Sequence, residues 1–210
     1  MTISVWSDIR CPFCYIAKRK LEDAISQFNN NEDKIIVEWK SFELDSNLQT
    51  NIDINLIDYY VNKGANKQQI TDLFTHAENM AKEVNLEFNL DKVVVANSFN
   101  AHKLIHLAKT INKQNEAKEL LFKAYLCEGK NIDSTNTLLS IGGVLGLSIN
   151  NVLEGLKSKK LKNEVFNDQI KAKEVGVSGV PFFIFNNKYS LSGAQPVETF
   201  LDVIEKAYNN

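Results

Sequence analysis

The run Thr2-Ile3-Ser4-Val5-Trp6-Ser7-Asp8-Ile9-Arg10-Cys11-Pro12-Phe13-Cys14 decides the fold, because it joins a β-branched stretch directly to two cysteines. Residues 2–6 are typical of a short strand. After the cysteines, apolar side chains recur at helical spacing, at Ile16, Leu21, Ala24, Ile25 and Phe28. The sequence therefore predicts a Cys-x-x-Cys pair at a strand-to-helix junction.

This placement favours reactive sulfur. Unpaired backbone N–H groups and the positive end of the helix dipole stabilise a thiolate at a helix N-terminus, where Cys11 stands. Pro12 suits the first helical position because it has no N–H to lose. Cys14 follows one turn later, close enough to form a small disulfide ring with Cys11. The motif indicates thiol–disulfide chemistry.

The main alternative for such a pair is half of a zinc site, which needs a second pair of ligands. Cys127 and the three histidines supply no such pair at the usual spacing. His102 and His106 stand four residues apart, but the glutamate of a zinc-protease helix is absent between them. We expect no metal site, and we expect Cys127 to be a buried core residue.

The next part of the chain predicts an α/β fold with an insertion. Residues 35–42 form a second strand after the first helix, which gives a β-α-β unit with parallel strands. Between residues 45 and 160 the pattern is helical, and only residues 92–96 could form a strand. Structureless connections beyond about 15 residues are rare in compact domains, so this stretch is a helical subdomain. The helices are expected at residues 54–63, 67–85, 98–113, 115–128, 135–145 and 150–156.

The last fifty residues return to the sheet. A helix after residue 161 ends at Gly176, and an apolar strand follows at residues 180–185. Asn186-Asn187 predicts a tight turn to an antiparallel strand at residues 189–192, because asparagine tolerates positive φ. Pro196 opens a final helix. We expect a thioredoxin-like domain of residues 1–44 and 161–210 around an insertion subdomain of residues 45–160.

Pro181 stands at the start of the apolar strand, a position where proline sacrifices no ladder hydrogen bond. In a thioredoxin-like sheet, the loop before this strand lies beside the helix that carries Cys11. A cis Val180–Pro181 bond in this loop would let the backbone of Val180 pair with an extended substrate peptide. Asp8 and Glu38 are carboxylates that could handle a proton near Cys14, but we expect them to be surface or strand-edge charges.

Composition excludes several other classes of protein. The chain has 210 residues, 44% apolar and 24% charged, as is typical of a folded globular protein. Its formal charge of −2 leaves no excess of positive charge, so we expect no nucleic-acid partner. No stretch approaches the roughly 18 apolar residues of a membrane span, and residues 1–6 lack the basic lead of a secretory signal. We expect a cytoplasmic protein with no membrane partner.

Several stretches together resemble the DsbA-like family, and within it the FrnE-type branch of cytoplasmic oxidoreductases. They are residues 7–16 with the Cys-Pro-Phe-Cys motif, 97–108, 128–132, 176–183 with Gly179-Val180-Pro181, and 192–196. The resemblance implies a thioredoxin fold interrupted by a helical domain. It also implies that Cys11 is the attacking cysteine, Cys14 the resolving cysteine and Pro181 the cis-proline.

The expected activity is thiol–disulfide exchange, with disulfide-containing proteins or glutathione as partners and no tightly bound cofactor. We expect Pro12, Phe13 and Val180 to contact the substrate. Pro12 and Phe13 bring no charge to the thiolate, so we expect a potential between about −270 and −180 mV, suited to a reductase or isomerase. The sequence is compatible with a monomer or a homodimer. Many members of the branch have Trp where Phe13 stands, and this difference bears on substrate preference.

Two other enzyme groups share this architecture, the kappa-class glutathione transferases and the 2-hydroxychromene-2-carboxylate isomerases. Those enzymes typically place a serine at the first position of the motif to activate glutathione. The presence of both Cys11 and Cys14 favours disulfide exchange over glutathione conjugation.

Overall fold

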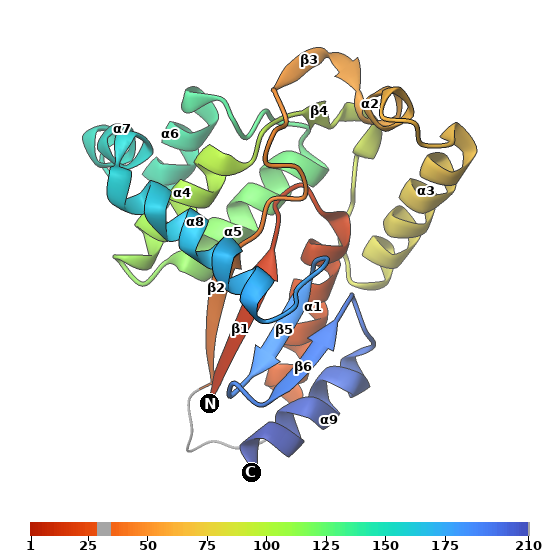
Figure 1. Ribbon diagram of the computed structural model, residues 1–210, viewed down its shortest axis with the longest axis vertical. Helices are drawn as coiled ribbons and strands as arrows, with labels where there is room; N and C mark the ends of the chain where they lie inside the picture. Colours follow the sequence, from red (N-terminus) through yellow and green to blue (C-terminus); the bar gives the residue numbers. More distant parts are fainter. Residues whose placement is uncertain (29–34, 210) are drawn as a thin grey trace. The chain divides into compact units, whose positions relative to one another are not determined.

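The computed structural model describes residues 1–28 and 35–209, which divide into two compact units (Figure 1). The first unit consists of Met1–Leu44 and Val165–Asn210, and the second of Asp45–Glu164. None of the helices in the described ranges is long and apolar enough to span a lipid bilayer.

The first unit contains a four-stranded sheet in the order β2-β1-β5-β6. Its strands are β1 (Thr2–Ser7), β2 (Ile36–Ser41), β5 (Phe182–Phe185) and β6 (Tyr189–Ser192). β1 runs parallel to β2 and antiparallel to β5, and its register places Trp6 opposite Phe182. The predicted turn between β5 and β6 is confirmed, with φ of 48° at Asn186 and 55° at Asn187.

Both faces of this sheet are covered. On one face, α1 (Pro12–Gln27) packs against α9 (Val197–Tyr208), and the ring of Phe200 meets the ring of Phe183 edge-on at 4.9 Å. On the other face, Trp6 packs with Ala172 of α8 (Lys159–Glu174). This two-sided burial explains why β5 is apolar throughout instead of alternating with polar residues.

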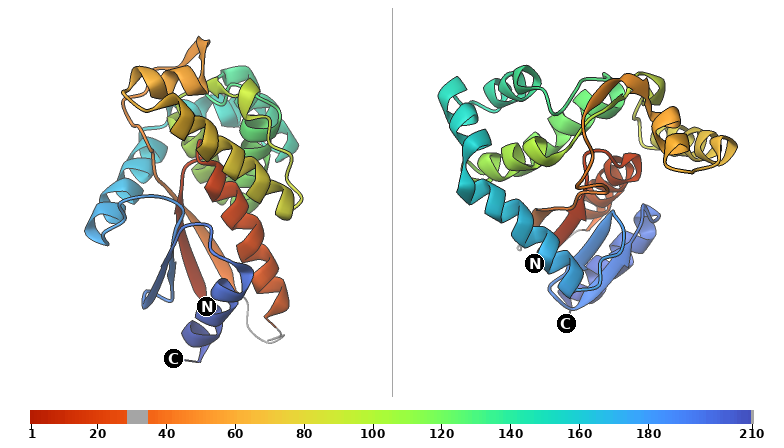
Figure 2. Two further views of the ribbon diagram at one scale, coloured as in Figure 1. Left: turned by 90° about the vertical axis from the view of Figure 1, so that its right-hand side faces the viewer. Right: turned by 45° about the horizontal axis from the view of Figure 1, so that its top comes forward.

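The second unit is largely helical (Figure 2). Its elements are β3 (Asn51–Asn55), α2 (Leu56–Asn62), α3 (Lys67–Glu83), η1 (Leu90–Lys92), β4 (Val94–Val95), α4 (Phe99–Lys109), α5 (Gln114–Phe122), η2 (Lys123–Cys127), α6 (Thr135–Val144) and α7 (Ile149–Lys157). The predicted fold class, a thioredoxin-like α/β fold with a large helical insertion, is confirmed.

The extents of two predicted helices in this unit and the predicted burial of Cys127 are wrong. The helix expected at residues 54–63 begins only at Leu56, because the Asn55 side chain accepts a hydrogen bond from the N–H of Asp58 at 2.8 Å and caps it. The preceding residues form β3, which pairs antiparallel with β4. The helix expected at residues 115–128 changes to a π-helix at Lys123–Cys127, and Cys127 is half-buried instead of lying in the core.

A cluster of polar side chains fixes the start of the second unit on α2. The Asp45 carboxylate accepts a hydrogen bond from the Tyr59 hydroxyl at 2.7 Å and another from the Lys63 ammonium. The hydrogen bond from Lys63 has the largest effect, and together the two contacts lower the pKa of Asp45 from 3.8 to about 2. Because the folded protein holds the ionised form, the cluster stabilises the fold above the unfolded pKa and loses this effect as pH falls toward 2.

Replacement Asp45→Asn should therefore lower the midpoint of thermal unfolding at pH 7 by about 2 °C, a modest value because the cluster is partly exposed. The difference between variant and wild type should shrink as the pH is lowered from about 5 to about 2. Scanning calorimetry at several pH values measures it. A difference that stayed constant across this range would show that the Asp45 charge does not stabilise the fold.

Candidate active site

The two motif cysteines lie at the first turn of α1. Cys11 is the N-cap residue, with φ −91° and ψ 111°, and Pro12 occupies the first helical position. The N–H of Cys14 donates to the carbonyl of Cys11 at 3.1 Å, so the second cysteine sits one turn into the helix. Both are buried, with 4% of Cys11 and 1% of Cys14 exposed, and both are thiols.

The loop before β5 meets Cys11, as predicted. The Val180–Pro181 peptide bond is cis. The Cys11 thiol donates to the carbonyl oxygen of Val180, with 3.6 Å between Sγ and O. The carbonyl of Pro181 accepts from the N–H of Gly193 at 2.9 Å, so the end of β6 holds this loop from its other side. The structure thus brings together Cys11, Val180 and Pro181 from distant parts of the chain.

The two residues between the cysteines are more exposed than the cysteines themselves. Pro12 and Phe13 are half-buried, which leaves part of their apolar surface open. The nearby cations on α1 are engaged elsewhere, since Lys18 and Arg19 pair with Glu22 at 2.6 and 3.2 Å. The charges of these two side chains are therefore paired one turn further along α1.

Asp8 is the residue whose role the sequence did not reveal. It was expected at the surface or at a strand edge, but its exposed fraction is 0%. Its Oδ1 accepts from the N–H of Arg10 at 3.1 Å, and its Oδ2 accepts from the N–H of Leu44 at 2.8 Å. Its own carbonyl accepts from the N–H of Cys11 at 3.1 Å. Asp8 therefore shapes the turn that presents Cys11.

A signal for this role exists in the sequence. Aspartate at the first position of a tight turn commonly accepts from the backbone two residues on, as Asp8 does from Arg10. Its second contact, with Leu44, depends on the tertiary fold and has no local signature. Glu38, the other carboxylate considered, lies at the sheet edge on β2 and pairs with Lys40 at 2.9 Å.

The residues considered for metal binding do not form a site. His102 and His106 are both buried on α4, and Nδ1 of His106 lies 3.4 Å from a carboxylate oxygen of Glu164. Within residues 1–28 and 35–209, no group of three or more histidine, cysteine, aspartate or glutamate side chains could hold a metal ion.

Comparison with known proteins assigns this arrangement to a family. The model of the DSBA-like thioredoxin domain matches residues 2–205, which is nearly the whole chain. The chain belongs to the DSBA-like thioredoxin domain family. Its curated relatives include the uncharacterized protein YwbO of Bacillus subtilis (strain 168), which is 28% identical over 213 residues and covers 99% of this chain and 96% of YwbO.

Solved structures with this DSBA-like fold agree. The probable DsbA oxidoreductase SCO1869 from Streptomyces coelicolor superposes with a TM-score of 0.91 at 25% identity, covering 100% of this chain and 91% of that one. The cytosolic disulfide reductase DsbM from Pseudomonas aeruginosa, solved with GSH, has a TM-score of 0.70 at 16% identity and covers 100% of both chains. The second likeness shows the fold alone.

The geometry at Asp8 predicts a specific loss of stability. Replacement Asp8→Ala removes the acceptors of two backbone N–H groups and should lower the free energy of unfolding by about 2–4 kcal/mol. Asp8→Asn keeps the size and one acceptor oxygen, so its loss should be smaller. Urea denaturation measures both, with the exposed carboxylate variant Asp23→Ala as the control. Equal stability of Asp8→Ala and Asp23→Ala would contradict the assigned role.

Proposed function

We propose that this protein is a thiol–disulfide oxidoreductase that reduces or isomerises disulfides in proteins through its Cys-Pro-Phe-Cys pair. The observation that carries the proposal is the contact between the Cys11 thiol and the carbonyl of Val180, 3.6 Å apart. It sets a sulfur at a helix N-terminus against a stretch of backbone that could pair with an extended substrate. Membership of the DSBA-like family supports the same chemistry.

In the proposed reaction, the Cys11 thiolate attacks one sulfur of the substrate disulfide. The substrate S–S bond breaks, a mixed disulfide with Cys11 forms, and the released substrate thiolate takes up a proton. The Cys14 thiolate then attacks the sulfur of Cys11 and releases the second substrate thiol. Two electrons have passed to the substrate, and the protein is left with a Cys11–Cys14 disulfide.

An external thiol must then restore the dithiol. We propose glutathione for this step, in which two molecules supply two electrons and leave as glutathione disulfide. The similarly folded DsbM has been solved with GSH, which motivates the choice. Such a cycle fits the cytoplasm, where glutathione keeps thiols reduced.

Pro12, Phe13 and Val180 are proposed to contact the substrate, and Pro181 to complete the catalytic surface. Their half-buried or adjoining positions beside Cys11 support this assignment. The alternative, a kappa-class transferase or 2-hydroxychromene-2-carboxylate isomerase, uses glutathione without a second cysteine. It predicts that glutathione conjugation or isomerisation survives replacement of Cys14, whereas disulfide exchange requires both sulfurs.

Cysteine variants test the proposal. Cys11→Ser should reduce insulin disulfides at least 100-fold more slowly than wild type, because the attacking sulfur is gone. Cys14→Ser should accumulate mixed disulfides on non-reducing gels, because nothing resolves them. Cys127→Ser, which removes the half-buried third sulfur, is the matched control and should behave as wild type. Equal insulin reduction by all three variants would rule out the mechanism.

A further inference from the structure

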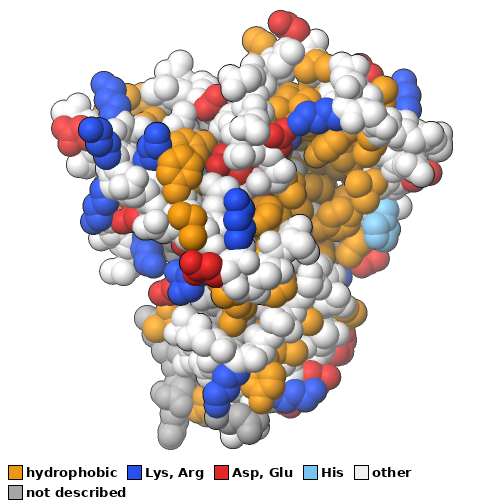
Figure 3. All heavy atoms as spheres, in the orientation of Figure 1, with side chains coloured by type: hydrophobic (Ala, Val, Ile, Leu, Met, Phe, Trp, Pro, Cys, Tyr) orange, Lys and Arg blue, Asp and Glu red, His pale blue; other side chains and the backbone are white. Residues whose placement is uncertain are grey.

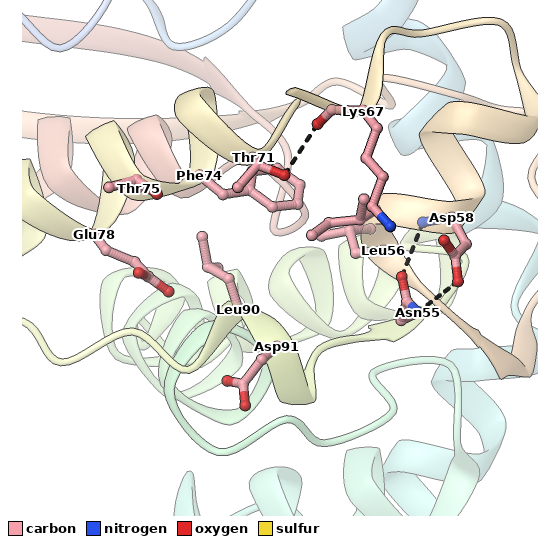
Figure 4. Close-up of a pocket in the computed structure, with 11 residues that line it drawn as sticks. Asn55, Leu56, Asp58, Lys67, Thr71, Phe74, Thr75, Glu78, Leu90 and Asp91 are labelled. Carbon is pink, nitrogen blue, oxygen red and sulfur yellow. Dashed lines mark hydrogen bonds between the residues drawn. The ribbon is translucent and has the colours of Figure 1, made fainter. Parts of the chain in front are cut away.

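A pocket of about 410 Å³ lies in the second unit (Figure 4). It is bounded by the start of α2, one face of α3, and η1. Its volume falls within the roughly 300–1,000 Å³ typical of sites for small ligands. Figure 3 shows apolar side chains gathered beside α2 and α3 on this face of the molecule.

The helical period of α3 creates one wall of the pocket. Its lining residues, Lys67, Thr71, Phe74, Thr75 and Glu78, are spaced three, four or one apart and so share one face of the helix. The buried residues of α3, Ala77 and Ala81, border this face on the side of Phe74, and none of the five lining residues is itself buried. The side chains on the pocket face of α3 therefore do not belong to the buried core of this unit.

The centre of the pocket is apolar. Leu56 from α2, Phe74 from α3 and Leu90 from η1 lie between its charged ends (Figure 4). Leu56 and Leu90 are 6% and 4% exposed, so they form a fixed floor, while Phe74 is half-buried and keeps part of its ring open. Such a surface accommodates an alkyl or aromatic body.

The charges at the two ends differ. At one end Lys67 lies with Asp58, whose carboxylate accepts from the Asn55 amide at 2.7 Å as part of the cap of α2. This end has no net charge. At the other end stand two carboxylates, Glu78 and Asp91. Within the described part of the chain, no hydrogen bond or ion pair engages either of them.

We propose that this pocket binds an organic cation with an apolar body. The cationic group would lie between Glu78 and Asp91, and the body would pack on Leu56, Phe74 and Leu90. Two carboxylates without a structural partner, beside an apolar floor, complement this class of ligand in charge and in polarity. Either a free arylalkylamine or a basic residue next to an aromatic one in a peptide has this chemistry. The proposal is independent of the thiol chemistry.

Titration of the full chain with 4-phenylbutylamine tests the charge requirement, with 4-phenylbutyrate as the anion of matched size. Isothermal calorimetry should show saturable binding of the amine and at least tenfold weaker binding of the carboxylate. Binding of the amine should weaken as salt is added. Equal affinity for the two probes, or no detectable binding of the amine at concentrations up to about 10 mM, would overturn the proposal.

Variants locate the binding. The double variant Glu78→Gln with Asp91→Asn should weaken amine binding at least fivefold, while Glu87→Gln, an exposed carboxylate outside the pocket, should not. Phe74→Ala should weaken it similarly, and Leu73→Ala, 43% exposed on the same helix but outside the lining, should not. Thermal unfolding verifies that each variant is folded. Unchanged binding in the double variant and in Phe74→Ala would place the amine elsewhere and refute the site.

A third titration separates the two sources of the ligand. The probe is the peptide acetyl-Phe-Lys-amide, which carries the same groups on a peptide backbone. Binding tighter than that of 4-phenylbutylamine assigns the pocket to peptide segments, and weaker binding assigns it to free amines. The Cys11→Ser protein should bind the probes as wild type does, so loss of the proposed redox function would leave this result unaffected.

Discussion

The antiparallel pairing of β1 with β5 is the constraint on which the site depends. It places Trp6 opposite Phe182, so the turn after β1 and the loop before β5 lie at the same end of these two strands. Cys11 and Val180, 169 residues apart, are brought into contact by this register. One face of each strand is fully buried and the other is at least partly buried, and a slip of one residue would exchange the two faces of a strand. The packing of the core therefore fixes the geometry of the thiol.

Asp8 joins the turn after β1 to the residue at which the chain leaves the first unit. Its carboxylate holds the turn that presents Cys11 and also the N–H of Leu44, the last residue before the insertion. After the insertion, where the chain has re-entered the first unit, the Asp168 carboxylate of α8 accepts from the N–H of Ser41 at 2.8 Å. Within the first unit, buried Asp8 thus holds the residue before the insertion, and half-buried Asp168 joins the segment after the insertion to β2. These contacts explain how the first unit keeps the turn that carries Cys11 in place although more than a hundred residues separate its two segments.

Most of the first unit could be predicted from local sequence signals. The cysteine pair at a helix start, the Asn186-Asn187 turn and the proline before β5 each follow from backbone preferences of single residues. What could not be predicted depends on contacts between distant residues. Asn51–Asn55 has low strand propensity and becomes β3 only by pairing with β4. The burial of Asp8, likewise, requires Leu44 as a partner.

The redox state of each cysteine at equilibrium tests the proposed pairing of Cys11 with Cys14 most directly. The protein is incubated in buffers of defined glutathione ratio, alkylated, and mapped by mass spectrometry. We expect a two-electron transition in which Cys11 and Cys14 join in one disulfide at a potential between about −270 and −180 mV, while Cys127 remains a thiol. Glutathione attached to Cys11 at every ratio, with no Cys11–Cys14 disulfide, would contradict it.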